Sequence, residues 1–261
     1  MKKLEFKHAA SFVALSLLSA AAAADKWEPG VGASVSYAPM YEIEGESKGV
    51  FEGDLYGVGI KYASASNNPV SAELNYQMGS NEYSRGSAEG DTTIIDADIT
   101  FGKAFFPGNW EFIPYLGLGF QQMEQDIDSA SYSNGNDLVT PSRTHRHLYI
   151  PVGLYLGSAS PLDQFDFYIS TEYQRVVMGE VKLSGAGSNT FNSNDGQGFR
   201  AEAGIHFPSE STFNLYSGIF YQQWDIEASD KSATVVDGVL TNRNEPATKQ
   251  VSAGVTIGLQ F

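Results

Sequence analysis

Two histidines give this chain its nearest approach to a catalytic arrangement. His145 and His147 are separated by one residue, and Glu172 lies on the polar phase of the next alternating segment. A histidine within hydrogen-bond reach of a carboxylate can act as a general acid or base. Asp126 and Asp128 precede the histidines, but two carboxylates fall far short of a calcium-binding loop. A hydrolytic site is therefore one alternative, and the sequence assigns no catalytic residue, metal or cofactor.

A second group of ionisable residues shares one feature: each occupies the polar phase of a segment in which apolar and polar residues alternate. If these segments enclose an interior, the group faces inward, and its mixed signs allow the salt bridges that buried charges require. The sequence therefore predicts a polar network that fills a narrow lumen, with a small pore as the alternative. The predicted network consists of Glu42, Lys61, Asp96, Asp98, Glu172, Arg200, Glu202 and His206.

The segments that position these residues have a period of two, the pattern of β-strands with one apolar face. Ten can be counted, at 31–43, 56–62, 70–78, 95–105, 112–120, 148–156, 165–177, 199–207, 213–221 and 251–261. The last one ends on Phe261 without a polar cap. An open sheet edge is too costly in lipid, so a terminal apolar strand indicates pairing with the first strand. We predict an all-β fold, an antiparallel up-and-down transmembrane β-barrel of ten strands.

The connections differ in length from one end of the predicted barrel to the other. Short turns fall near Pro69, Pro107, Ser158 and Pro208, whereas longer polar stretches cover 44–53, 79–92, 123–143, 179–197 and 227–249. Outer-membrane barrels have short periplasmic turns and long external loops. We therefore expect the loops to be extracellular and both termini to be periplasmic.

The first 24 residues are expected to be a cleaved secretory signal, leaving 25–261 as the barrel domain. Lys2, Lys3 and Lys7 precede an apolar run, and small residues end at Ala24. Without this segment the chain keeps 13 basic and 30 acidic residues. Such an acidic balance argues against nucleic acid as a partner. The chain has no cysteine, which excludes disulfide and thiol chemistry.

Two stretches carry a family resemblance. Residues 112–120 (FIPYLGLGF) and 251–261 (VSAGVTIGLQF) resemble the small outer-membrane β-barrels of Gram-negative bacteria, the opacity-protein and outer-membrane-protein-A-like group. The resemblance implies location in the outer membrane, with eight strands as the alternative count, and it implies no activity. It also implies that the last strand is a signal for the barrel assembly machinery, carried by Val255, Ile257, Leu259 and Phe261.

Some ten-stranded barrels of similar size are proteases with a carboxylate pair and an Asp–His pair at the outer rim. The sequence context of that Asp–His pair is absent here.

Arg146 and Arg175 lie on the apolar phase near the outer end of their strands. A register that places Leu148 opposite Tyr173 would make the two arginines neighbours, and their guanidinium groups could then hold a lipopolysaccharide phosphate. The same reasoning places Leu156 opposite Phe165 and Phe207 opposite Phe213.

The sequence thus favours a non-enzymatic surface protein of the Gram-negative outer membrane. Its role would be structural or adhesive, with a host or envelope ligand bound by polar loops on a rigid scaffold. Its other expected partners are membrane lipid, lipopolysaccharide and, during biogenesis, the assembly machinery. A narrow porin-like channel is the second interpretation, and a hydrolase active at the rim is the third.

Overall fold

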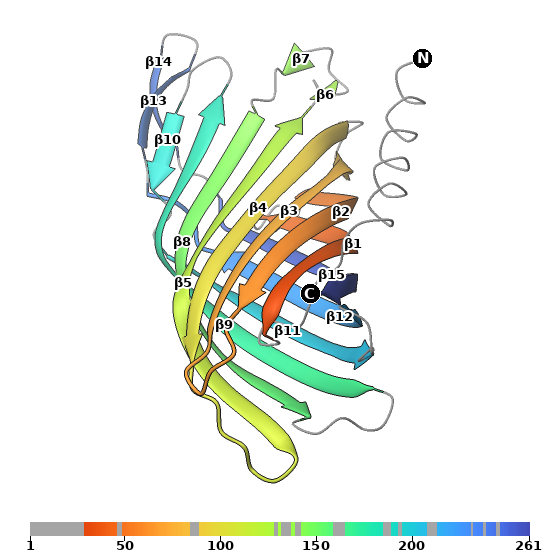
Figure 1. Ribbon diagram of the computed structural model, residues 1–261. Helices are drawn as coiled ribbons and strands as arrows, with labels where there is room; N and C mark the ends of the chain where they lie inside the picture. Colours follow the sequence, from red (N-terminus) through yellow and green to blue (C-terminus); the bar gives the residue numbers. More distant parts are fainter. Residues whose placement is uncertain are drawn as a thin grey trace, which may run out of the picture.

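Ten long strands form a closed antiparallel barrel in the computed structural model (Figure 1). The structure describes residues 29–45, 49–83, 89–127, 130–131, 137–138, 142–158, 165–184, 189–192, 195–207, 213–230, 232–236, 239–243 and 246–261. Each long strand pairs with the next one along the chain, and the last pairs with the first. The predicted fold and the count of ten strands are confirmed, and the eight-stranded alternative is wrong. The expected signal at 1–24 lies outside the described residues.

The barrel strands are β1 (Gly30–Glu44), β2 (Gly49–Ala63), β3 (Val70–Tyr83), β4 (Glu89–Gly102), β5 (Trp110–Ile127), β8 (Ser142–Ser158), β9 (Asp166–Ser184), β11 (Gly196–Phe207), β12 (Asn214–Ile226) and β15 (Thr248–Gln260). Short strands lie between some of them: β6 (Ala130–Ser131), β7 (Asp137–Leu138), β10 (Asn189–Asn192), β13 (Ser232–Val236) and β14 (Val239–Arg243). No helix among the described residues is long and apolar enough to cross a membrane.

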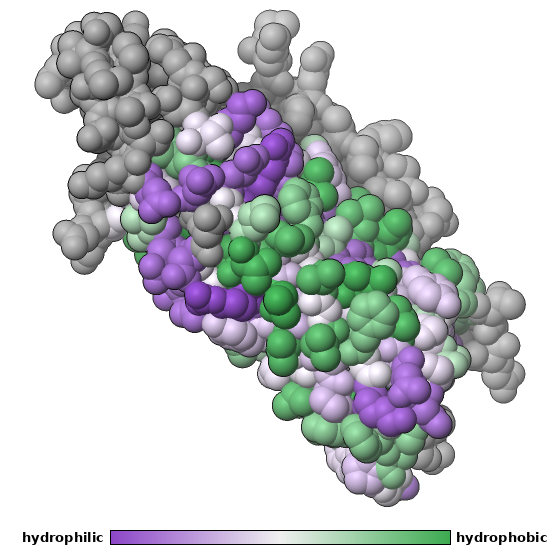
Figure 2. Space-filling model, turned by 90° about the vertical axis from the view of Figure 1, so that its left-hand side faces the viewer, coloured by the Kyte–Doolittle hydropathy of each residue, from purple (hydrophilic) through white to green (hydrophobic). Residues whose placement is uncertain are grey.

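The outer face of the barrel is apolar, because alternate residues of each strand point away from the lumen. On β15, for example, Val255 and Ile257 are exposed, as is Phe261 directly after it, whereas Ser252 and Gln260 are buried. Figure 2 shows apolar side chains gathered over the middle of one outer face, with hydrophilic side chains above them. Phe261 closes the sheet, since its backbone N–H donates to the Val31 carbonyl and its own carbonyl accepts from the Val31 N–H.

The two ends of the barrel differ less than predicted. We call the end with the β2–β3, β4–β5, β8–β9 and β11–β12 connections the turn end, and the opposite end the loop end. At the loop end, β1 and β2 leave only 45–48 between them, and β3 and β4 leave only 84–88. The long polar stretches predicted at 44–53 and 79–92 are therefore largely strand. Above the apolar band both faces of a strand carry polar residues. The alternation of apolar and polar residues is lost there, so the sequence does not reveal these parts as strand.

On one side of the barrel the strands extend further at the loop end. β5, β8 and β9 have 17 to 19 residues, against 12 to 15 for the other barrel strands. β9 pairs with β11 only as far as Arg175 and then continues to Ser184, where it pairs with β10 instead. We call this part of β8, β9 and β10 the tall wall. It stands beside the β13–β14 hairpin in Figure 1.

The register differs from the one predicted. Leu156 lies opposite Ile169 rather than Phe165, and Phe207 lies opposite Leu215 rather than Phe213. Both shifts in register are even numbers of residues, so each side chain stays on its predicted face. Alternation alone therefore cannot distinguish the observed register from the predicted one. A β-bulge in β9 adds a further residue, so that Leu148 faces Met178 and not Tyr173.

Glycines on the inner face provide space for aromatic rings. Gly119 on β5 lies opposite Tyr149 on β8, and a Cβ atom at Gly119 would be 2.1 Å from Tyr149 Cζ. In the same way Gly153 is covered by the ring of Tyr115, with a distance of 2.3 Å to its Cζ. The rings therefore lie flat against the neighbouring strand and line the inner wall of the barrel.

This packing gives a prediction for Gly119→Ala. The added methyl group would collide with the Tyr149 ring and force it off its position, which is expected to cost about 1–3 kcal/mol. Urea unfolding of the barrel in lipid vesicles would measure the loss. In a Tyr149→Ala background, the same Gly119→Ala change should cost almost nothing, because the ring is gone. An equal cost in both backgrounds would contradict this explanation.

Candidate functional site

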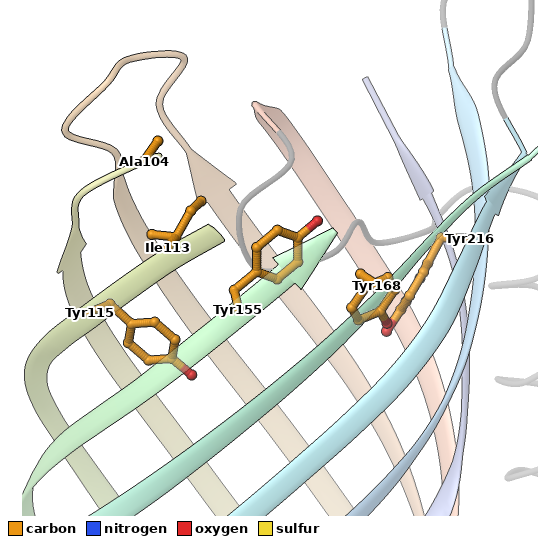
Figure 3. Packing of buried hydrophobic residues seen from close by; sticks show 6 residues of the cluster. All are labelled: Ala104, Ile113, Tyr115, Tyr155, Tyr168 and Tyr216. Carbon is orange, nitrogen blue, oxygen red and sulfur yellow. The ribbon is translucent and has the colours of Figure 1, made fainter. Parts of the chain in front are cut away.

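A layer of tyrosines narrows the lumen near the turn end. Tyr115, Tyr155, Tyr168 and Tyr216 project inward from β5, β8, β9 and β12, and all four are buried. Figure 3 shows their rings inside the strand ends, with Ile113 and Ala104 beside them. We call this layer the tyrosine floor.

Hydrogen bonds and ring contacts fix the tyrosine floor. The hydroxyl of Tyr168 donates to Glu202 Oε1 over 2.8 Å, and the hydroxyl of Tyr216 donates to the same oxygen. The ring of His206 lies 5.3 Å from that of Tyr168 and 5.5 Å from that of Tyr216. Buried hydroxyls thus find an acceptor, and the layer has the polar satisfaction that a stable core requires.

A polar cavity of about 70 Å³ lies next to this floor. Arg200 is its central cation, with a guanidinium nitrogen 3.2 Å from Glu202 and 3.6 Å from Glu73. Across the cavity, Asp96 accepts hydrogen bonds from Tyr149 at 3.0 Å and from Gln121 at 3.2 Å. Four carboxylates and two cations line this space: Glu73, Asp96, Glu172 and Glu202 with Lys61 and Arg200. Its volume is far below the roughly 300 Å³ of a small-molecule site.

A second barrier crosses the lumen at the loop end. Arg143 of β8 forms a salt bridge with Glu42 of β1, and its Nε donates to Gln125 of β5 over 3.0 Å. Gln125 in turn donates to Glu42 over 2.7 Å. The guanidinium also lies over the Phe51 ring, 5.6 Å from its centre. All four side chains are buried. We call this group the arginine bar.

The structure places all eight residues of the predicted network on the inner face, but in different layers. Glu42 belongs to the arginine bar, and Glu202 and His206 contact the tyrosine floor. The cavity holds Lys61, Asp96, Glu172, Arg200 and Glu202. Asp98 is buried on β4, where its cross-strand neighbour is Glu73. The cavity residues therefore form one group, whereas Glu42 and His206 belong to its two boundaries.

The histidine–carboxylate pair considered for a hydrolase does not form. His145 lies opposite Met123 and Val181, and His147 lies opposite Gln121 and Gly179. Glu172 instead accepts a hydrogen bond from Gln174 over 2.8 Å. The bulge in β9 and the continuation of β8 place the histidines beyond the level of Glu172. Both are buried between the arginine bar and Trp224, whereas Asp126 is exposed on the outer face and Asp128 lies outside the described residues.

Arg146 and Arg175 are not neighbours, so the predicted pair is wrong. Arg146 lies opposite Glu180 and forms a salt bridge of 2.9 Å with it. Arg175 lies opposite Ile150 and pairs with Asp195 at 2.7 Å. The register moves the two arginines apart, and each meets a carboxylate on the outer surface. A lipopolysaccharide contact stays a prediction for each arginine separately.

Several residues that close the lumen were missed by sequence reasoning. Arg143 and Gln125 belong to the predicted 123–143 loop but lie on strands. Extending the period of two beyond 120 and before 148 would have placed both on the inner phase. The four floor tyrosines also lie on the polar phase of their strands, and for Tyr115, Tyr155 and Tyr216 the glycine two residues later was the available signal.

The comparisons with known proteins agree with this architecture. The family model described as "Outer membrane protein beta-barrel domain" matches residues 10–140. No curated protein sequence matches the chain. Among solved structures, the outer membrane protease OmpT from Escherichia coli is similar with a TM-score of 0.55 and 10% identity, over 89% of this chain and 96% of that chain. At this identity the likeness shows the fold alone.

Two other barrels are similar at lower TM-scores. The translocator domain of the autotransporter NalP from Neisseria meningitidis has a TM-score of 0.42 and 12% identity, over 89% of both chains. Neisserial surface protein A has a TM-score of 0.35 and 11% identity, over 88% of this chain and 99% of that chain.

Proposed function

This chain belongs to the outer membrane protein beta-barrel domain family, and from that premise we propose a non-conducting, non-enzymatic barrel that acts at its loop end. The observation that carries the proposal is the double closure of the lumen. The tyrosine floor and the arginine bar lie on either side of the central cavity, and both consist of buried side chains held by hydrogen bonds. A transport path along the barrel axis would have to displace one charged layer and one aromatic layer.

The loop end is the proposed functional surface. We infer that it faces the outside of the cell, because short turns are typical of the periplasmic end of such barrels. The tall wall and the β13–β14 hairpin extend the barrel there on one side. Rigid extensions of this kind hold binding loops at a distance from the membrane, which suits a structural or adhesive role toward a host or envelope ligand.

The positions of the histidines support the proposal that the barrel is not an enzyme. His145 and His147 are buried beneath the arginine bar, and within the described residues neither hydrogen-bonds to a carboxylate. A substrate approaching from outside would meet Arg143 and Glu42 first. On the outer surface we propose lipid and lipopolysaccharide as partners, and for β15 the assembly machinery.

Conductance across a planar bilayer tests the closed lumen. The purified, folded wild-type barrel should show no stable open state, because no water-filled path passes the tyrosine floor and the arginine bar. Insertion would be checked in the same membranes by the resistance of the barrel to added protease. Reproducible unitary steps from wild-type protein would overturn the proposal.

A narrow channel is the second candidate function, and the polar cavity is the observation that favours it. Four carboxylates and two cations line the cavity, so a path through it would carry net negative charge. The current would then be selective for cations. Cation-selective steps in the bilayer experiment would therefore support the channel in place of the closed scaffold.

A further inference from the structure

The histidine pair under the arginine bar is the largest unexplained polar feature of the lumen. His145 and His147 have exposures of 2% and 4%, and their ring centres are 6.1 Å apart. The Nε2 atom of each ring is buried and has no hydrogen-bond partner in the protein. Because alternate strand residues share a face, both rings come from β8 into the same part of the lumen. Two buried nitrogen atoms without partners are costly unless something else binds them.

A buried methionine lies on the strand that pairs with the histidine strand. Met123 is buried and lies directly opposite His145 in the β5–β8 ladder, where facing Cβ atoms come within about 5 Å. Met40 of β1 belongs to the same buried cluster as Met123, and its Sδ accepts a hydrogen bond from Gln250 at 3.3 Å. The side chains in this part of the lumen therefore offer imidazole nitrogen and thioether sulfur as metal ligands.

This donor set selects among metal ions. No group of three His, Cys, Asp or Glu side chains in the described part of the chain could hold a metal, which argues against zinc and harder cations. Thioether sulfur is a soft ligand that favours monovalent copper, and imidazole binds it as well. The nearest carboxylate of the arginine bar, Glu42, is already bound by Arg143 and Gln125.

We propose that His145, His147 and Met123 form a binding site for a soft monovalent metal ion, Cu(I) or its analogue Ag(I). The carboxylates of the adjacent cavity outnumber its cations, and the Arg143 guanidinium beside His145 is itself paired with Glu42. The ring of Trp224 stacks on that of His147, with 6.3 Å between the ring centres. The rival explanation is that buried water alone satisfies the two nitrogen atoms.

Silver binding to the purified, folded full barrel tests the site, because Ag(I) is soft and stable in air. Equilibrium dialysis of silver nitrate in chloride-free buffer, with metal analysis of the protein, should show a single tightly bound ion that excess Zn(II) does not displace. The double variant His145→Gln/His147→Gln should lose this ion, and Met123→Leu should weaken binding by at least about tenfold. Met178→Leu changes an exposed methionine on the outer face and is the matched control, with unchanged binding expected.

The result that would overturn the proposal is equally definite. Wild-type barrel that binds no silver would leave water as the occupant, and loss of the silver to Zn(II) would show that the site does not select a soft ion. A silver ion retained by the double variant would place the site elsewhere. If the double variant does not fold, X-ray absorption at the silver edge of the wild-type protein decides: nitrogen and sulfur neighbours support the site, and oxygen neighbours alone exclude it. None of these outcomes depends on whether the lumen conducts.

Discussion

Replacing Arg200 by methionine is expected to lower the free energy of unfolding by about 3–5 kcal/mol, because removing one partner of a buried ion group leaves the others uncompensated. Arg200 bridges Glu73 and Glu202 inside the lumen. Without it, Lys61 is the remaining cation among the residues that line the cavity. Carboxylates that share an enclosed space without a counter-charge repel one another and lose hydration at the same time.

Urea unfolding in lipid vesicles, followed by tryptophan fluorescence, measures this loss. Arg175→Met is the matched control: Arg175 also forms an ion pair at 2.7 Å, but on the exposed surface, where such pairs contribute about 0–1 kcal/mol. Neutralising two of the acids in Glu73→Gln/Glu202→Gln should reduce the cost of Arg200→Met. A loss no larger than that of Arg175→Met would show that water already screens the cavity charges.

Arg143→Met is expected to have a comparable effect, about 3–5 kcal/mol, since it leaves Glu42 as a buried carboxylate without its counter-ion. The side chain of Glu42 is fully buried, and among the residues that the structure describes Gln125 would be its one remaining hydrogen-bond donor. The change also removes the guanidinium from the Phe51 ring. The double variant Glu42→Leu/Arg143→Met should recover most of the stability, because an apolar pair of similar volume has no charge to compensate.

The same strand provides the control for this second prediction. Arg146 is three residues from Arg143 on β8 and pairs with Glu180 at 2.9 Å, but it faces outward and is exposed. Arg146→Met should therefore cost less than about 1 kcal/mol. Equal losses for Arg143→Met and Arg146→Met, or a double variant that is no more stable than Arg143→Met, would show that the arginine bar is not a buried ion pair in solution.

The fold and the inward placement of the charged residues could be predicted because a strand has a period of two. Alternation assigns Arg200 and Asp96 to one face and Ile257 to the other, whatever the details of pairing. The same property limits the prediction. A register shift of two or four residues preserves every face, so Leu156 could not be matched to Ile169 from the pattern, and the Arg146–Arg175 pair was misplaced.

Other parts of the site lay beyond the reach of the sequence for different reasons. Above the apolar band both faces of a strand are polar. The sequence pattern therefore predicts a loop where Gln125 and Arg143 lie at the ends of strands. The bulge in β9 falls at Val177, opposite Leu148 and Tyr149, within a run of apolar residues that reads as regular strand. The contact between His147 and Trp224 joins β8 to β12 across the two strands between them, β9 and β11, and depends on the curvature of the sheet.

The arginine bar also has a consequence for the order of events during assembly. Glu42 is separated from Gln125 by 83 residues and from Arg143 by 101, so their contacts join the first strand to the fifth and sixth. Contacts across such long loops form late, because the entropy of closing the intervening chain must be lost first. Glu42 can meet Arg143 across the lumen only when the wall has curved round far enough to bring β1 opposite β8. The arginine bar therefore forms only after the strands from β1 to β8 have curved until their ends face each other, and a barrel in which these strands are misplaced would lack it.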